Sequence, residues 1–311
     1  MKILVLGAGG VGGLFGGRIL QAGGEVSFLV RERRREQLRQ RGLVIESPSG
    51  DATLDVDARL QDEIGPDHDL VLLTCKAYDL PSAIEAIRPA MGGRAAVLPL
   101  LNGLAHIDLL NAEFGPSKVI GGTARVQATL TADGVVRQLN DWQQMVFGEQ
   151  DGSVSRRLED LKALLDRTPI QGRLSTDIAR DMWLKLVHLS TIAGLTCLMR
   201  ANLGEIARTP EGSELLRRFF DTNVAIATHF GHRPDEKFIA DYRALFDQRD
   251  LPYEASMLRD IERGGPVEAD QILGDMLKKC REAGQPDLLH RVAYTHVKAY
   301  EERRAAARLP G

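Results

Sequence analysis

The sequence is poor in cysteine, and its few cysteines stand far apart. Cys75, Cys197 and Cys280 are the only three among 311 residues, and no two of them form a C-x-x-C pair. This spacing argues against a disulfide framework and against a structural zinc site, which needs clustered ligands. Reduced, scattered thiols are typical of a cytoplasmic protein, so we expect that compartment and no bound metal.

An excess of charge of either sign is also missing. The 40 basic and 43 acidic residues leave a formal net charge of −3 at pH 7. A protein that binds nucleic acid usually presents a strongly basic surface, so this balance argues against a nucleic-acid partner. The 43% hydrophobic content suits a packed core, and the length suits about two domains.

No apolar run is long enough to cross a membrane. A long segment without a charged side chain, residues 186–199, contains His188 and several hydroxyl or glycine positions. It falls short of the roughly 18 apolar residues that a membrane span requires, and it indicates a buried helix instead. The apolar run Ile3–Leu6 is too short for a secretion signal. We therefore expect no membrane partner.

The first half of the chain alternates between strand and helix patterns. Ile3–Leu6 is apolar on both faces, which predicts a buried parallel strand, and residues 10–21 continue with helical spacing. Further strands are expected at residues 25–30, 69–74 and 95–101, and a further helix at residues 81–91. Such alternation predicts the parallel sheet of an α/β Rossmann domain.

Between residues 119 and 148 the pattern changes to that of antiparallel strands. Residues 126–131 and 135–139 flank Ala132-Asp133-Gly134, a hairpin signal, and residues 144–147 could pair next. We expect an antiparallel extension of the parallel sheet, followed by a helix at residues 155–165.

The remainder of the chain is almost wholly helical. Helices are expected at residues 177–200, 211–230, 234–247, 254–262, 266–283 and 288–304. The sequence thus predicts an α/β Rossmann domain at residues 1–173 and an all-α domain at residues 174–311. The long helical half leaves a homodimer open, because its helices could bury an interface.

A glycine-rich loop follows the first strand. Gly7-Ala8-Gly9-Gly10-Val11-Gly12 matches G-x-G-x-x-G and opens a helix. In such a loop the first glycine permits a tight turn, the second lets the backbone approach a pyrophosphate, and the third allows the helix to pack closely on the sheet. The free N–H groups at the helix start favour phosphate. We predict that these six residues bind a dinucleotide.

Arg31 indicates which dinucleotide is bound. An NAD site usually carries an acidic residue at the end of the second strand, whereas an arginine suits the 2′-phosphate of NADPH. Arg31 stands at that place, and Glu32, one residue later, is a contrary signal that would favour NADH. Residues 33–35, all arginines, are expected to form the solvated start of a helix. The predicted cofactor is NADPH.

Nearly the whole chain resembles the ketopantoate reductase (2-dehydropantoate 2-reductase) family. The matching segments are Gly7–Gly12, Thr74-Cys75-Lys76-Ala77, Leu101-Asn102-Gly103, Trp183-Leu184-Lys185-Leu186, and Ser256–Asp260 through Glu268-Ala269-Asp270. Their spread over both expected domains is much more specific than the glycine loop alone. The resemblance implies a Rossmann domain joined to a helical domain, a small keto acid as the partner, and reduction of a 2-keto acid by NADPH.

The resemblance implies catalytic roles for Lys185 and Glu268. Lys185 lies among apolar neighbours, where a lysine can polarise a carbonyl and donate a proton to the alkoxide that forms. The alternative is a lysine that extends to the surface. Glu268 would contact the reacting region of the substrate or orient the lysine. We expect it in the first turn of a helix, where a carboxylate also complements the helix dipole.

Three further residues are expected to bind ligands. The resemblance implies that Ser256 binds the substrate carboxylate, although a serine there also suits a helix N-cap. Lys76 and Asn102 each follow a predicted strand, and open α/β sheets bind ligands at the carboxyl ends of their strands. We expect both to face the cofactor and the substrate. Gly103 leaves open a plain turn at Asn102.

The chain departs from the family pattern in the substrate site. The family carries asparagines four and eight residues after the lysine, on the same helix face, where this sequence has Leu189 and Ala193. A later family asparagine corresponds to Leu203, with Asn202 one place away. His188 lies too far round the helix to replace either amide. Losing a hydrogen bond to a substrate hydroxyl changes discrimination by as much as roughly 10⁴-fold, so the identity of the keto acid stays open.

Two other functions remain alternatives. One is a related two-domain dehydrogenase for a β-hydroxy acid or a sugar-acid phosphate, against which the segment from Ser256 to Asp270 argues. The other is a non-catalytic NADP(H)-binding sensor. The loss of two amides keeps a sensor open, and the retention of Lys185 and Glu268 argues against it.

Overall fold

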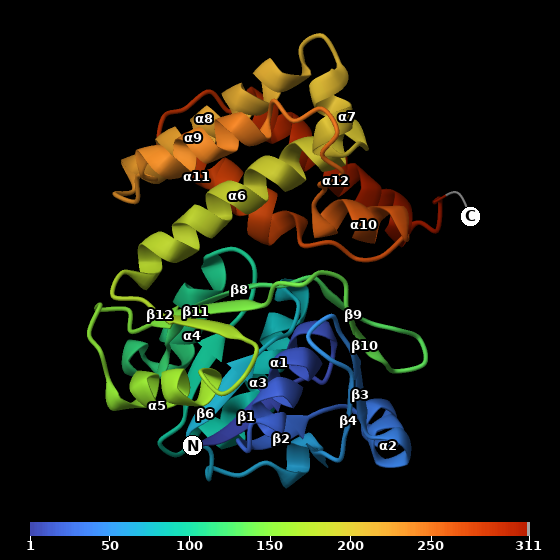
Figure 1. The fold of residues 1–311 in the computed structure, drawn as a ribbon. Coiled ribbons are helices and arrows are strands. Elements are labelled where there is room, and N and C mark those ends of the chain that lie inside the picture. Colours follow the sequence, from blue (N-terminus) through green and yellow to red (C-terminus); the bar gives the residue numbers. More distant parts are fainter. Residues whose placement is uncertain (310–311) are drawn as a thin grey trace. The chain divides into compact units, whose positions relative to one another are not determined.

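The computed structural model describes residues 1–309, which form two compact units (Figure 1). The first unit comprises Met1–Leu101 and His106–Asp181. The second comprises Asn102–Ala105 and the chain from Met182 onward. The main division therefore falls within the first turn of the long helix α6 (Ile178–Met199).

A five-stranded parallel sheet forms the centre of the first unit. Its strand order is β5-β2-β1-β6-β7. The bounds are β1 Lys2–Leu6, β2 Glu25–Leu29, β5 Asp57–Arg59, β6 Leu70–Leu73 and β7 Ala96–Pro99. Strand β1 can lie in the middle because it is apolar on both faces: Ile3 and Val5 enter one core and Leu4 enters the other. The strand order reverses beside β1, where open α/β sheets bind ligands. The predicted Rossmann sheet is confirmed.

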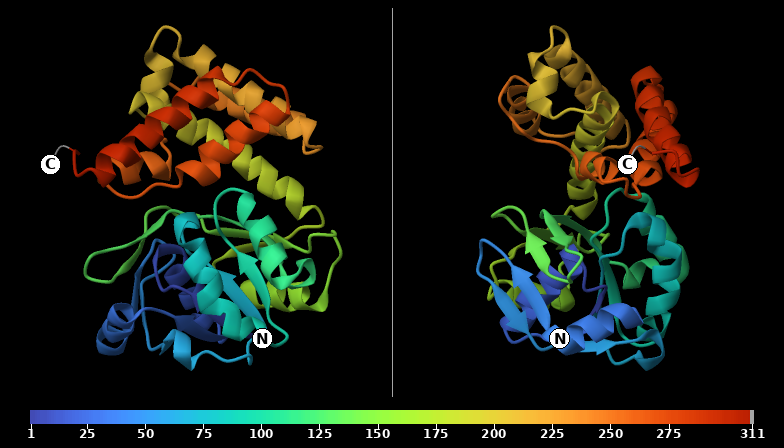
Figure 2. Two further views of the ribbon diagram at one scale, coloured as in Figure 1. Left: turned by 180° about the vertical axis from the view of Figure 1, so that it is seen from behind. Right: turned by 90° about the vertical axis from the view of Figure 1, so that its right-hand side faces the viewer.

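Helices cover both faces of this sheet. Leu14 and Phe15 of α1 (Gly10–Gln21) pack in the same core as Leu161 of α5 (Arg156–Leu165). Ile87 of α3 (Leu80–Met91) and Leu110 of α4 (Ala105–Phe114) pack in the core of the opposite face. The right-hand view of Figure 2 shows α3 and α4 along one side of this unit and the smaller strands along the other.

Two smaller sheets extend the first unit. One has the order β4-β3-β10-β9 and the other β12-β11-β8. Their strands are β3 Leu43–Glu46, β4 Ala52–Leu54, β8 Gly121–Arg125, β9 Ala128–Leu130, β10 Val136–Gln138, β11 Gln144–Gly148 and β12 Gln171–Leu174. The predicted hairpin is confirmed, because β9 and β10 pair antiparallel. Strand β11 pairs with β8 and β12 rather than with the hairpin, so that expectation was wrong.

Helices make up the second unit, as predicted. Their bounds are α6 Ile178–Met199, α7 Leu203–Arg208, α8 Gly212–His229, α9 Glu236–Leu245, α10 Ser256–Glu262, α11 Asp275–Glu282 and α12 Leu288–Ala305. The helix expected at residues 266–283 begins later than predicted, and it begins with a π-helical turn. Residues 266–268 are not helical, and the π-helical turn η4 (Asp270–Gly274) leads into α11.

The long helix α6 is the core of the second unit. Among residues 1–309 it is the one helix long and apolar enough, by length and composition, to cross a membrane. However, 72% of its most apolar window is buried inside the structure. Leu186, Val187 and Leu195 lie in one hydrophobic cluster, and Ala193 lies in another. The prediction of a buried helix at residues 186–199 is confirmed.

A buried polar chain crosses the second unit. The Nε2 atom of His290 lies 2.8 Å from the Oδ1 atom of Asn223, and the Nδ2 atom of Asn223 donates to the Oγ1 atom of Thr191 at 2.9 Å. The Nδ1 atom of His290 is buried with no hydrogen-bond partner within residues 1–309. Burial lowers the pKa of His290 to about 4, because a charged imidazolium would lose its hydration here.

His290 should make the folded protein less stable in mild acid. Its pKa is about 4 when folded, against an unfolded value of 6.5, so the unfolded chain binds the extra proton as the pH falls through that window. The free energy of unfolding should therefore fall by at most about 3 kcal/mol between pH 6.5 and pH 4. Urea melts of the wild type and of His290→Gln at several pH values measure the effect. Equal pH dependence in the two proteins would contradict this assignment.

Candidate functional site

The glycine loop has the close packing that its spacing predicts. Gly7 adopts φ +91°, a conformation that favours glycine, and its N–H donates to the carbonyl oxygen of Leu29 at 2.9 Å. A Cβ on Gly12 would lie 2.1 Å from the carbonyl oxygen of Gly7, so no larger residue fits there without movement. Helix α1 can therefore start directly against the end of β1.

Gly9 differs from Gly12, because it faces open space. It is the N-cap of α1, and a Cβ on it would meet no atom within 4 Å. Beside it lie the N–H groups of the first helical turn, which have no partners within the helix. An open backbone surface at a helix N-terminus fits a phosphate group. The residues present therefore fit the pyrophosphate of a dinucleotide.

Arg31 lies beyond β2 and is exposed. It is the N-cap of α2 (Glu32–Arg41), and its side chain makes no cap hydrogen bond. Glu32, the contrary signal in the sequence, forms an ion pair with Arg35 at 2.9 Å, and Arg35 also contacts Glu63 at 3.1 Å. The carboxylate of Glu32 is thus engaged along its own helix.

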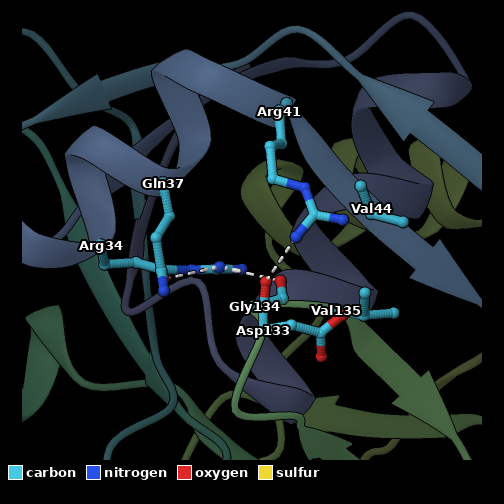
Figure 3. Close-up of a pocket in the computed structure, with 8 residues that line it drawn as sticks. Arg34, Gln37, Arg41, Val44, Asp133, Gly134 and Val135 are labelled. Carbon is cyan, nitrogen blue, oxygen red and sulfur yellow. Dashed lines mark hydrogen bonds between the residues drawn. The ribbon is translucent and has the colours of Figure 1, made fainter.

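Arg34 is the residue of this region that the sequence did not single out. Its Nε atom donates to the carbonyl oxygen of Ala8 at 3.1 Å, and its Nη1 atom donates to that of Gly134 at 2.9 Å. Figure 3 shows its side chain reaching from α2 to the hairpin turn. The expectation of a solvated helix start was therefore wrong for Arg34 and Arg35, which are half-buried, and only Arg33 is exposed. Sequence patterns could not find this contact, because its partners are backbone carbonyls far along the chain.

Lys76 lies near the carboxyl end of β6, as expected. It is exposed and is the N-cap of the short 3₁₀ helix η2 (Ala77–Asp79). Two residues earlier, the Oγ1 atom of Thr74 donates to the carbonyl oxygen of Leu6 at 2.8 Å. This bond joins the ends of β6 and β1 beside the glycine loop. Thr74 belongs to one of the matching family segments, but its role was not predicted.

Asn102 and Glu268 meet in the second unit. The Nδ2 atom of Asn102 donates to the Oε2 atom of Glu268 at 3.2 Å, although 166 positions separate the two residues. Gly103 adopts φ +86°, and a Cβ on it would lie 2.5 Å from the carbonyl oxygen of Gln271 in η4. The turn at Asn102 is thus more than a plain turn, because it packs against the backbone that follows Glu268.

Glu268 is buried, with 5% of its surface exposed. It precedes Ala269, the first helical residue, so the expectation that it lies in the first helical turn was wrong. Its carbonyl oxygen accepts from the N–H of Ile272 at 3.3 Å, and η4 follows directly. Such π-helical turns frequently occur at functional sites.

Lys185 lies on α6 and is half-buried. Leu189 and Ala193, one and two turns further on, pack in a cluster that also contains Met257, Val267 and Ala269. Leu189 and Ala193 occupy the positions where the family carries asparagines. Their apolar neighbours in this cluster include residues next to Ser256 and Glu268 in the sequence. The side chains at these two positions therefore have apolar surroundings.

Ser256 is available for a ligand. It is exposed and is the first residue of α10, whose N-cap is Ala255, so the alternative of a serine N-cap was wrong. Its hydroxyl makes no hydrogen bond to any other residue in the described part of the chain, 1–309.

Asn202 and His188, two other polar residues on or near α6, form hydrogen bonds within the protein. Asn202 caps α7, accepting from the N–H of Glu205 at 2.9 Å, while Leu203 is fully buried. The side-chain oxygen of Asn202 thus serves as a helix cap. The two ring nitrogens of His188 lie near the hydroxyls of Tyr242 and Tyr253, which makes this side chain part of a buried network.

The structure places the predicted residues on both units. The first unit carries the glycine loop, Arg31 and Lys76, and the second carries Asn102, Lys185, Ser256 and Glu268. Asn102 follows β7, as expected, yet its contacts belong to the helical unit.

Comparisons with known proteins identify the same family in both units. Residues 3–152 match the family model described as ketopantoate reductase PanE/ApbA, and residues 177–301 match that of its C-terminal domain. The chain is 30% identical over 301 residues to the uncharacterized oxidoreductase YkpB of Bacillus subtilis, covering 97% of this chain and 99% of the relative. It is 29% identical over 300 residues to the 2-dehydropantoate 2-reductase of Archaeoglobus fulgidus, covering 96% and 98%.

Solved structures share the whole fold. The 2-dehydropantoate 2-reductase of Geobacter metallireducens superimposes with a TM-score of 0.87 at 28% identity, covering 96% of this chain and 99% of that one. A D-mandelate dehydrogenase, solved with NADH and anilino(oxo)acetate, has a TM-score of 0.86 at 22% identity, covering 98% and 100%. The second likeness concerns the fold alone.

Two glycine substitutions should separate ligand binding from folding. Gly9→Ala places a methyl group in open space, so we expect an unchanged melting temperature but at least tenfold weaker dinucleotide binding. Gly12→Ala must displace the carbonyl of Gly7, so it should lower the free energy of unfolding by about 1–3 kcal/mol. The melting temperature should fall by several degrees as a result. Thermal melts and fluorescence titration with NADPH measure both. Unchanged NADPH binding by Gly9→Ala would show that the open surface is not the binding site.

Proposed function

Because the chain belongs to the ketopantoate reductase family, we propose that it is an NADPH-dependent reductase that converts a 2-keto acid into the 2-hydroxy acid. The family makes it an oxidoreductase of small keto acids. The observation that carries the proposal is the hydrogen bond from Asn102 to Glu268, which joins two predicted site residues from distant parts of the sequence. The cytoplasmic location and the homodimer remain predictions.

The first unit would hold the cofactor. The N–H groups at the start of α1 and the open backbone at Gly9 suit the pyrophosphate, and exposed Arg31 suits the 2′-phosphate. Glu32 pairs with Arg35, which favours NADPH over NADH because a free carboxylate would be needed to bind the ribose hydroxyls. When bound, NADPH supplies the hydride for the reduction.

The second unit would supply the proton and orient the substrate. Lys185 polarises the keto group and donates its proton to the oxygen that becomes the hydroxyl. Buried Glu268 accepts from Asn102 with one carboxylate oxygen, which fixes the orientation of the group toward substrate or lysine. The exposed hydroxyl of Ser256 binds the substrate carboxylate.

The substrate side group is apolar in this proposal. Leu189 and Ala193 pack in a hydrophobic cluster where the family pattern has amides. A site without those donors gains nothing from a substrate hydroxyl and must desolvate it. We therefore propose a 2-keto acid that lacks the hydroxyl group of ketopantoate.

A matched pair of substrates tests the function. We expect saturable NADPH oxidation with 3,3-dimethyl-2-oxobutyrate, which is ketopantoate without its hydroxyl, and a kcat/KM at least as high as that for ketopantoate.

Lys185→Ala should lower kcat by at least about 10²-fold with NADPH binding preserved, the usual scale of a general acid. The exposed Lys278→Ala is the control and should retain full activity.

Other results would redirect the proposal. A strong preference for ketopantoate would mean that other groups replace the missing amides. Full activity of Lys185→Ala would remove this lysine from the mechanism. NADPH binding without turnover of any 2-keto acid or 3-keto acid would favour the sensor function.

Arg31→Ala should change the choice of cofactor. Removing the guanidinium takes away a charge-assisted contact to the 2′-phosphate, so the Kd for NADPH should rise about 10- to 100-fold while that for NADH stays constant. Arg33→Ala, an exposed arginine on the same helix, should change neither Kd. Equal weakening of both dinucleotides by Arg31→Ala would contradict the phosphate contact.

A further inference from the structure

The hairpin of β9 and β10 packs directly on the glycine loop and the helix that follows. A Cβ on Gly10 would lie 2.6 Å from the carbonyl oxygen of Ala128, where β9 begins. A Cβ on Gly13 would lie 2.7 Å from a methyl group of Val136 in β10. The hairpin therefore supports α1 at two points, and these small residues permit the approach.

Arg34 links the loop to the turn of the same hairpin. Its guanidinium donates from Nε to the carbonyl oxygen of Ala8 and from Nη1 to that of Gly134, and Nη1 also contacts Gln37 at 3.3 Å. Gly134 adopts φ +90°, and a Cβ on it would lie 2.9 Å from Nη1 (Figure 3). The planar fork of an arginine can reach two acceptors at fixed angles, which an ammonium group cannot do.

The charge of Arg34 is not used in an ion pair. Within residues 1–309 its partners are two carbonyls and one amide, and its Nη2 atom is buried with no partner. Burial lowers the pKa of this guanidinium from its ordinary value. A half-buried cation without a carboxylate partner gains little stability from its charge. The placement of Arg34 is better explained by its hydrogen bonds to two backbone segments, one at Ala8 and one at Gly134.

The contact with Ala8 sets the direction of the next N–H group. In a trans peptide the carbonyl and the following N–H point in opposite directions, and no cis peptide bond occurs among the described residues. When Arg34 holds the carbonyl of Ala8, the N–H of Gly9 must point away from Arg34. Gly9 is also the glycine of the loop that faces open space at the start of α1.

We infer that Arg34 is a positioning residue, which holds the peptide between Ala8 and Gly9 in the orientation that binds a dinucleotide, with the hairpin 128–138 as its support. The inference rests on the proposed function, since it assumes that the glycine loop binds the cofactor. Arg31 recognises the 2′-phosphate in that proposal, whereas Arg34 acts on the loop and therefore on NADPH and NADH alike.

Three variants test this role. Arg34→Met should raise the Kd of both NADPH and NADH about tenfold, because the loop must be ordered on binding. Arg34→Lys should behave like Arg34→Met, since it keeps the charge and loses the fork. Arg41→Met is the matched control: Arg41 donates to Asp133 in the same turn at 3.1 Å but lies outside the loop, so both Kd values should stay near wild type. If Arg34→Met fails to fold, Arg34→Gln and Arg34→Lys carry the test.

A second measurement needs neither cofactor nor activity. Amide hydrogen exchange of the free protein should be faster at residues 9–12 in Arg34→Met than in wild type or Arg41→Met. Unchanged exchange and unchanged Kd values would overturn the inference. So would weakening of NADPH alone, which indicates a phosphate contact, or full rescue by lysine, which indicates a role of charge. A failure to reduce keto acids would contradict the proposed function. The Kd values and the hydrogen exchange would still test the role of Arg34, because neither measurement depends on turnover.

Discussion

The close approach of α1 to the end of β1 is the constraint on which the first unit depends. The carbonyl of Gly7 occupies the place where a side chain of residue 12 would stand, so the strand, the turn and the helix form one continuous unit. Thr74 ties the neighbouring strand to the same corner, and the hairpin packs against the first residue of α1. A rigid loop at the point of strand reversal leaves its N–H groups oriented before any ligand arrives, which reduces the ordering needed on binding.

The second unit buries the polar side chain of Glu268, and its sequence neighbours Val267 and Ala269 pack in one cluster with Leu189 and Ala193 of α6. Glu268 is buried just before a π-helical turn, and its hydrogen bond from Asn102 supplies part of the compensation that a buried carboxylate needs. Leu189 and Ala193 keep the neighbouring face of α6 apolar. The second unit thus holds a hydrogen-bonded carboxyl group and an apolar face of α6.

Much of the fold was predictable because its signals are local. The alternation of buried strands and helices predicted the parallel sheet, and Asp133-Gly134 predicted the hairpin. The errors lie where partners are distant in sequence. Strand β11 pairs with β8 and β12 rather than with the hairpin, Arg34 reaches two remote carbonyls, and the helix after Glu268 starts late because of η4. None of these contacts leaves a periodic pattern in the chain.

The sequence by itself determined the class of the protein: a Rossmann unit, a helical unit, a glycine loop with Arg31 after the second strand, and the candidates Lys185 and Glu268. These follow from periodicity, from glycine spacing and from family motifs, all of which can be recognised without knowing the fold. Only the tertiary structure decided that Glu32 pairs with Arg35, that Asn102 meets Glu268, and that Asn202 is used as a helix cap. The physical reason is that a polar side chain acts according to the partner it reaches, and folding chooses that partner.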